Sequence, residues 1–242
     1  MFKDHFSGHA SDYAAHRPTY PPALFSYLAS LCERRQLVWD AGTGNGQAAV
    51  DLAAHFERVV ATDPSEQQLS NAIPHRRVEY RIARSEESPL EGSSADLVTV
   101  AQAFHWFDAS AFFEEARRVL RPNGVLAVWC YGTFFGDETD ATIARFRSVV
   151  DSYWPLDRTM GEDGYADVTF PFNELPAPGF EMSVLWTADQ TLNYLRTWSA
   201  VRRYIDATGK DPVDEIADEL RATWKLEPRR VSWPLHLRVM RT

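Results

Sequence analysis

The sequence predicts an α/β protein built on a doubly wound, mostly parallel sheet of seven strands, with a helical N-terminal arm and an insertion after the fifth strand. Two observations predict this class. Apolar, strand-like segments alternate with helix-like segments between residues 37 and 131, and the first of these strands runs into a glycine-rich turn that opens a helix. In open sheets of this kind, ligands bind at the carboxyl ends of the strands. We therefore expect a ligand site where the first strand ends.

Composition narrows the class further. The 242 residues carry a formal net charge of -9 with scattered basic residues, which argues against a nucleic-acid partner. Cys32 and Cys130 lie far apart without a neighbouring histidine cluster, so neither a disulfide framework nor a metal site is expected. No run of eighteen apolar residues is present, so we expect no membrane association and a cytoplasmic protein. We expect a single domain: an arm and helix over 1–36, a ligand-binding core over 37–130, and an insertion with the last two strands over 131–242.

The glycine-rich turn follows the first predicted strand. An aromatic arm over Phe6–Tyr20 precedes a helix that starts near Pro21, and Leu37–Trp39 forms the strand. Glycines at alternate positions in Gly42–Gly46 permit positive φ and let a ligand approach the backbone. A helix then runs from Gln47 to near Phe56, and its N-terminus offers free N–H groups to a polar ligand.

A second acidic position lies 23 residues after Asp40. The segment Arg58–Asp63 reads as a strand that ends in a carboxylate, and Ser65 and Gln68 have the spacing of a helix cap. An ionised aspartate has two acceptor oxygens and can take both hydroxyls of a ribose. Asp63 is therefore a candidate ribose ligand, although an aspartate at a helix start is also common on protein surfaces.

The next two strands lead into the predicted crevice. Val78–Ala83 alternates as a strand, and Ala95–Ala101 reads as a central strand that is covered on both faces. Its end continues into Gln102–Phe107, which we expect to line the crevice. Asp108 caps the following helix, and the turn Arg121–Gly124 ends it before a fifth strand at Val125.

The alternation breaks after Tyr131. We expect the aperiodic, aromatic stretch 153–178 to be an insertion over the active-site end of the sheet. The remaining predicted elements are a helix over Asp140–Val150, a strand over Gly179–Thr187, helices over Leu192–Ala207 and Pro212–Trp224, and a final strand over Val231–Met240.

Four features in order resemble the class I S-adenosylmethionine-dependent methyltransferases. They are Asp40, the loop Gly42–Gly46, Asp63 and the turn Arg121–Gly124, and the resemblance is strong over residues 10–130. A nicotinamide-dependent oxidoreductase on a similar sheet is the main alternative, but its fingerprint needs a small residue at the sixth position, with Gly42 counted as the first, and this chain has Gln47 there. A non-catalytic nucleoside-binding module stays open as a further alternative.

Three further segments resemble the trans-aconitate methyltransferase-like branch: Tyr13–Pro21, Phe104–Phe107 and Trp198-Ser199. This resemblance implies O-methylation of a carboxylate on a small-molecule acid. Relatives with the same arm act on other small molecules, so a phenol, a quinone or another metabolite remains an alternative acceptor.

The resemblance also implies roles for individual residues. S-adenosyl-L-methionine is the implied cosubstrate, and its implied binding residues are Tyr13, Arg17, Asp40, Gly42, Gly44, Asp63, Pro64, Gln68, Ser85, Glu86, Ala101 and Gln102. Candidate acceptor-side residues are Tyr20, His105, Trp106, Trp198 and Arg202. A carboxylate acceptor is already ionised and requires no base, whereas a hydroxyl acceptor would need one, and His105 is then the best candidate. His105 can equally be a half-buried histidine that shapes the pocket.

Overall fold

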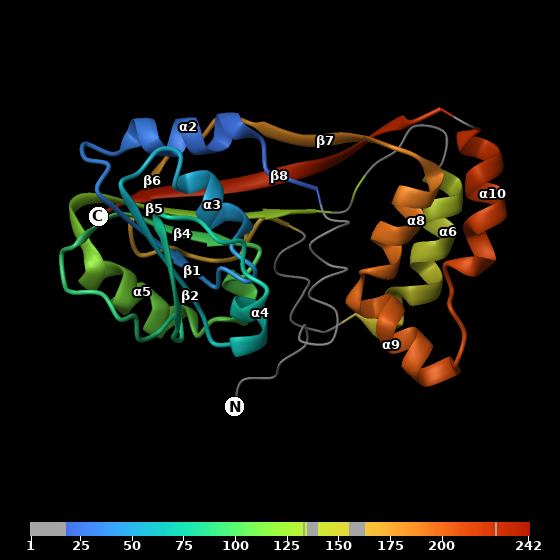
Figure 1. Ribbon diagram of the computed structural model, residues 1–242, viewed down its shortest axis with the longest axis horizontal. Helices are drawn as coiled ribbons and strands as arrows, with labels where there is room; N and C mark the ends of the chain where they lie inside the picture. The colour runs from blue at the N-terminus through green and yellow to red at the C-terminus, as the bar shows by residue number, and fades with distance from the viewer. Residues whose placement is uncertain (1–17, 133, 135–139, 155–162, 226) are drawn as a thin grey trace.

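The computed structural model describes residues 18–132, 134, 140–154, 163–225 and 227–242. Its centre is one mixed sheet in the order β3-β2-β1-β4-β5-β8-β6, with β7 also paired to β8 (Figure 1). The parallel strands are β1 (Leu37–Ala41), β2 (Arg58–Asp63), β3 (Val78–Ile82), β4 (Ala95–Ala101) and β5 (Leu120–Tyr131), and the antiparallel partner of β5 is β8 (Arg229–Arg241). The strand order reverses between β1 and β4, which confirms the doubly wound sheet.

The sheet has eight strands, one more than the seven expected. β6 (Asn173–Leu175) and β7 (Phe180–Trp186) share the outer edge of β8, where β6 pairs with its last residues and β7 with its first. The described part of the stretch 153–178, which reads as aperiodic in sequence, therefore contains one short strand. Both strands run antiparallel to β8 and complete the sheet at that edge.

Helices cover both faces of the parallel part of the sheet. Successive residues of the central strands point to opposite sides, so both faces carry apolar side chains that pack against a helical layer. Val38 packs into one apolar layer with α2 (Pro22–Leu31) and α3 (Gln47–Leu52), whereas the next residue, Trp39, packs into the opposite layer with α5 (Ala109–Val119). Two short elements, α4 (Glu66–Ser70) and η1 (Phe104–Trp106), follow β2 and β4. They begin at the carboxyl ends of those strands, so they position the residues of the predicted crevice.

A helical bundle lies beyond the carboxyl ends of β4 and β5 (Figure 1). It consists of α6 (Asp140–Val150), α8 (Ala188–Arg196), α9 (Ser199–Thr208) and α10 (Asp214–Trp224), with η2 (Asp151–Tyr153) after α6. The long ribbon of β7 and β8 joins the bundle to the sheet, and two indoles tie the parts together: Trp224 donates to the carbonyl of Trp186 at 2.8 Å and Trp233 to the hydroxyl of Tyr194 at 3.0 Å.

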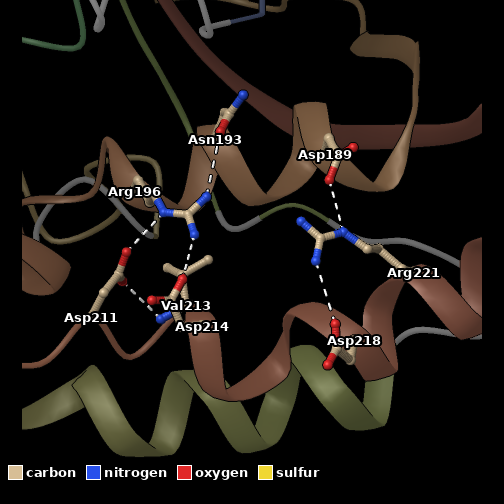
Figure 2. A network of polar contacts seen from close by, with 8 residues as sticks. All are labelled: Asp189, Asn193, Arg196, Asp211, Val213, Asp214, Asp218 and Arg221. Carbon is tan, nitrogen blue, oxygen red and sulfur yellow. Dashed lines mark hydrogen bonds and ion pairs between the residues drawn. The ribbon is translucent and has the colours of Figure 1, made fainter.

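Ion pairs between arginines and aspartates join α8 to α10 on the bundle surface (Figure 2). Arg196 donates to Asp211 at 2.8 Å and to Asp214 at 2.7 Å, so one guanidinium joins α8 to the start of α10. Farther along the same two helices, Arg221 on α10 donates to Asp189 on α8 at 2.9 Å. The aromatic core of the bundle is thus supplemented by ion pairs at its edge.

Three expected boundaries are wrong. The predicted helix Leu192–Ala207 is two helices, because Trp198 has an extended backbone (φ -71°, ψ 133°) and packs into the bundle core. The helix after the glycine loop ends at Leu52 and not near Phe56. Arg121–Gly124 does not separate two elements: it bulges within β5, where the register steps from Ala95↔Leu120 to Leu97↔Val125.

Among the described residues, no helix is long and apolar enough to cross a bilayer.

Candidate functional site

The glycine loop is held by close packing on two sides. Gly42 and Gly46 both have positive φ, +68° and +84°. A Cβ on Gly42 would lie 2.7 Å from the Cβ of Ala103, and one on Gly46 would lie 2.1 Å from the hydroxyl of Tyr80. Both positions therefore require glycine for space as well as for backbone conformation. The contact between Gly42 and Ala103 also places the turn after β4 directly against the loop.

Gly44 differs from Gly42 and Gly46 because a Cβ there would overlap none of the described atoms. Its φ is +58°, and the nearest atom to a Cβ built there would be the amide oxygen of Gln68 at 3.9 Å. Gly44 N–H donates to Asp63 Oδ2 at 2.9 Å, which fixes the loop against the end of β2. A ligand can therefore approach the backbone here, between the loop and the nearly buried Gln68.

Asp63 uses each carboxylate oxygen to hold the local backbone. Oδ1 accepts the N–H of Ser65 at 2.9 Å while Oδ2 holds Gly44, and the residue is 9% exposed. Ser65 in turn caps α4 by accepting the N–H of Gln68 at 3.3 Å, as its spacing predicts. Each carboxylate oxygen has two acceptor positions, and these two backbone bonds occupy one position on each oxygen.

Asp40 is a fully buried carboxylate between two hydroxyl groups. Its oxygens accept from Thr43 at 2.6 Å and from Thr99 at 2.7 Å. Burial raises the pKa of Asp40 to about 6, the nearby charge of Asp63 adds to this rise, and the two hydroxyls oppose it. No basic side chain pairs with Asp40 among the described residues. A ligand cation at this position would compensate the buried negative charge.

The loop after β3 reaches the same end of the sheet. The N–H of Ala83 donates to the carbonyl of Asp63 at 3.3 Å, and Ser85 is buried. Burial alone would raise the pKa of Glu86, but hydrogen bonds from Asp108 N–H (3.1 Å) and Arg84 (3.0 Å) lower it overall. Glu86 thus links this loop to the start of α5. Pro64, between Asp63 and Ser65, is half-buried.

The end of β4 carries a strained turn. Gln102 has a φ of +54°, which is uncommon for a residue other than glycine. Its N–H donates to the carbonyl of Trp129 at 2.9 Å and its amide to that of Tyr131 at 3.2 Å. These bonds hold a conformation that costs about 1–3 kcal/mol. Half-buried Ala101 and strained Gln102 therefore lie at the carboxyl end of β4, next to the point between β1 and β4 where the strand order reverses.

His105 and Trp106 lie in η1, directly after this turn. Both are half-buried, and their rings lie 4.7 Å apart. The Nδ1 atom of His105 is 3.2 Å from the hydroxyl of Tyr165, a residue of the insertion. Because Ala103 and Phe107 pack on Gly42, η1 lies beside the glycine loop.

The structure separates the other acceptor-side candidates. Tyr20 is buried and lies edge-on to Trp129, with ring centroids 5.6 Å apart. Trp198 is buried among bundle aromatics, and exposed Arg202 pairs with Asp206 at 3.2 Å on the bundle surface. Within the described ranges, no contact joins Trp198 or Arg202 to the glycine loop. Tyr13 and Arg17 lie outside the described residues.

Four residues of this region are not predicted from the sequence as members of the site. Thr43 and Thr99 hold Asp40, and the pairing of Thr99 depends on the register of β1 against β4. Tyr165 lies in the aperiodic insertion. The indole Nε1 of Trp129 is buried without a hydrogen-bond partner in the described structure, a condition that costs about 1–3 kcal/mol. Only Thr43 carries a sequence signal, as a hydroxyl residue inside the glycine loop.

The fold and this site define a nucleoside-binding α/β protein of the methyltransferase type. Residues 39–128 match a methyltransferase-domain family. A methyltransferase of Dictyostelium discoideum is 35% identical over 230 residues, which cover 93% of this chain and 88% of that protein. A methyltransferase-like protein of Schizosaccharomyces pombe is 33% identical over 228 residues, covering 90% and 86%. A structure described as a type II methyltransferase, from Anaeromyxobacter dehalogenans, superposes with a TM-score of 0.88 at 44% identity, covering 93% and 97%.

The chain therefore belongs to the class I S-adenosylmethionine-dependent methyltransferases, and S-adenosylmethionine is its cosubstrate. The residues present fit this group on chemical grounds. Asp40 is a buried carboxylate that pairs with no basic side chain among the described residues, the described residues leave space at Gly44, and the Asp63 carboxylate accepts N–H and O–H donors. The described residues contain no cluster of three or more potential metal ligands. The nicotinamide alternative is not supported by any of these relatives.

Proposed function

We propose that this methyltransferase transfers a methyl group to a carboxylate oxygen of a small acid. The observation that carries the proposal is the composition of the crevice beyond β4. Of the side chains that the structure describes after β4, His105 has Nδ1 engaged by Tyr165, and the Gln102 amide is engaged by a backbone carbonyl. Such a site can bind and orient an acceptor, and a carboxylate requires no more than that because it is ionised at neutral pH.

We also propose which residues hold the cosubstrate. Asp40 and Gly44 lie nearest the cationic and polar methionine end, and Asp63 takes the ribose hydroxyls. Gln68 and Pro64 flank the base on one side, with Ser85 and Glu86 toward its edge and Ala101 and Gln102 beside the methionine moiety. Support comes from the shared end of the sheet: loop, β2 end and β4 end are joined through Gly44–Asp63 and Gly42–Ala103 contacts. Tyr13 and Arg17 remain proposals from the resemblance alone.

The chemistry demands little of the protein beyond positioning. Bound S-adenosylmethionine supplies an electrophilic methyl group, so that transfer to a carboxylate forms a C–O bond as the C–S bond breaks and yields a neutral ester, S-adenosylhomocysteine and no proton. Residues of η1 and the insertion hold the acceptor in line and exclude water. A net charge of -9 also disfavours a polyanionic nucleic acid as acceptor.

A methyl-transfer screen tests the acceptor class. The purified chain would be incubated with labelled S-adenosylmethionine and with matched pairs of small carboxylic acids, including trans-aconitate, and phenols of similar size. We expect base-labile methyl esters from one or more acids. Transfer to phenols but to no acid would refute the carboxylate proposal and favour His105 as a general base.

Asp63→Asn tests the ribose assignment. The amide keeps one acceptor oxygen but places an NH₂ group toward one of the two backbone N–H donors, at Gly44 or Ser65. Losing such a bond costs about 1–3 kcal/mol, and we expect cosubstrate affinity to fall roughly 5- to 150-fold in calorimetric titration. Asp96→Asn is the control for a general effect on the sheet, because Asp96 accepts the backbone N–H groups of Gln36 and Leu37 through Oδ2 and pairs with Arg121 through Oδ1, at the opposite end of β1. Equal affinity losses in both variants would contradict the assignment.

A further inference from the structure

The insertion contributes a buried tyrosine that holds the crevice histidine. Tyr165 is 1% exposed, and its ring packs edge-on against Phe104 with centroids 5.2 Å apart. Its hydroxyl lies 3.2 Å from Nδ1 of His105, and the two rings are nearly parallel at 25°. A half-buried side chain on η1 is thus fixed by a residue distant in sequence.

Strand β8 anchors Tyr165 in turn. Arg238 donates to the carbonyl of Tyr165 at 2.9 Å. The preceding Gly164 has a φ of +67°, and a Cβ there would lie 2.6 Å from the Cβ of His236. Tyr165 itself has a φ of +59°, an uncommon conformation for an aromatic residue. Such strain persists only where the surroundings enforce it, so the hydroxyl is held in place.

The direction of the hydrogen bond follows from what surrounds the hydroxyl. Burial raises the pKa of Tyr165 well above its ordinary value, so the phenol keeps its proton at neutral pH. The charge of Cys130 would raise this pKa further. A buried neutral phenol has one proton to donate, and the hydrogen bond that the described structure gives this hydroxyl joins it to Nδ1 of His105.

Two acceptors compete for that proton, Nδ1 of His105 and the sulfur of Cys130. Burial raises the pKa of the Cys130 thiol to about 12, so the sulfur is a neutral thiol and a weak acceptor. A neutral imidazole nitrogen is the stronger acceptor. The Tyr165 hydroxyl therefore donates to Nδ1, and Nδ1 carries no proton in the neutral ring.

We propose that Tyr165 is a positioning residue that holds His105 as the Nε2–H tautomer, so that His105 meets the methyl acceptor as a hydrogen-bond donor. This inference rests on the proposed function and specifies its acceptor class. A donor at Nε2 binds the carboxylate oxygen that is not methylated. It cannot remove a proton from a phenol, because a general base needs an unprotonated nitrogen toward its substrate.

Nitrogen NMR of the histidine rings tests the tautomer directly. The full chain is labelled with ¹⁵N-histidine and recorded at a pH where the rings are neutral, and His105→Gln assigns the His105 signals. We expect His105 to show a protonated Nε2 and an unprotonated Nδ1. In Tyr165→Phe, which removes only the hydroxyl, the tautomer ratio should fall about fivefold or more, as expected for one hydrogen bond of about 1 kcal/mol.

Cys130→Ala is the matched control. It removes the competing acceptor from the same hydroxyl and should leave the Nε2–H tautomer in place. A wild-type spectrum with the proton on Nδ1, or a Tyr165→Phe spectrum like that of the wild type, overturns the inference. Failure of every acid in the methyl-transfer screen, with the tautomer intact, would instead contradict the proposed function.

Discussion

Replacing Asp40 by asparagine should stabilise the free protein and weaken its binding of S-adenosylmethionine. The side chain is fully buried and its pKa rises from an ordinary 3.8 to about 6, mainly through burial. At 1.36 kcal/mol per pH unit, this rise corresponds to about 3 kcal/mol of destabilisation by the charged form. Asparagine has nearly the same shape and can bond both Thr43 and Thr99, since its oxygen accepts and its NH₂ donates.

The sign of the pH dependence follows from linkage. Between about pH 4 and pH 6, the native Asp40 binds a proton that the unfolded chain does not, so its contribution to stability increases as the pH falls through this window. Above pH 6 the penalty is complete, and below the ordinary pKa it vanishes. The stability difference between Asp40→Asn and the wild type should therefore be largest at pH 7–8 and disappear near pH 4.

Thermal unfolding at several pH values measures this difference. A chain of this size gains about 2–4 °C per kcal/mol, so the midpoint should rise by up to about 10 °C at pH 8. Calorimetric titration of the same variant should show weaker cosubstrate binding, because the charge that compensates the ligand cation is gone. An Asp40→Asn variant that is less stable than the wild type at pH 8, or a stability difference that does not change with pH, would contradict a burial penalty on the charged Asp40.

Two further substitutions probe the loop and the bundle. Gly46→Ala should lower both stability and cosubstrate affinity because its Cβ would overlap Tyr80, whereas Gly209→Ala, at a similar φ of +73° in open space, should cost only about 1–2 kcal/mol and leave affinity unchanged. Arg196→Ala should reduce the free energy of unfolding by about 1 kcal/mol without altering cosubstrate affinity, and its control, exposed Arg203→Ala, should change neither quantity. Denaturant titration measures the free energy of unfolding and calorimetric titration measures the affinity. A loss of affinity in Arg196→Ala would show that the bundle acts on the cosubstrate site.

Local sequence signals predict most of the sheet but not every helix. The bounds of β2, β4 and α6 agree with the expected segments because apolar patterns and capping residues mark their ends. The break between α8 and α9 has no glycine or proline to signal it. It arises because Trp198 leaves helical geometry to pack against Phe146 and Tyr194 in the bundle. Tertiary packing overrides local propensity there.

The site divides in the same way. Glycines and aspartates that act on the backbone beside them, such as Gly42 and Asp63, are visible in sequence because loop geometry needs those residue types at fixed spacing. The partners that tune the site are not. Thr99 meets Asp40 through strand register, and Tyr165 meets His105 through the path of the insertion, so neither follows from spacing along the chain.

The contact between Gly46 and Tyr80 has a consequence for the entropy of binding. The Tyr80 hydroxyl donates to the carbonyl of Ile73 at 2.7 Å, and the N–H of Ile73 donates to the carbonyl of Asn45 at 3.0 Å. The loop, the segment after α4 and the edge strand β3 are thus linked to one another by consecutive contacts. The conformational entropy of the loop is lost when the protein folds and not when the nucleoside arrives. A strand at the far edge of the sheet thereby strengthens binding through preorganisation.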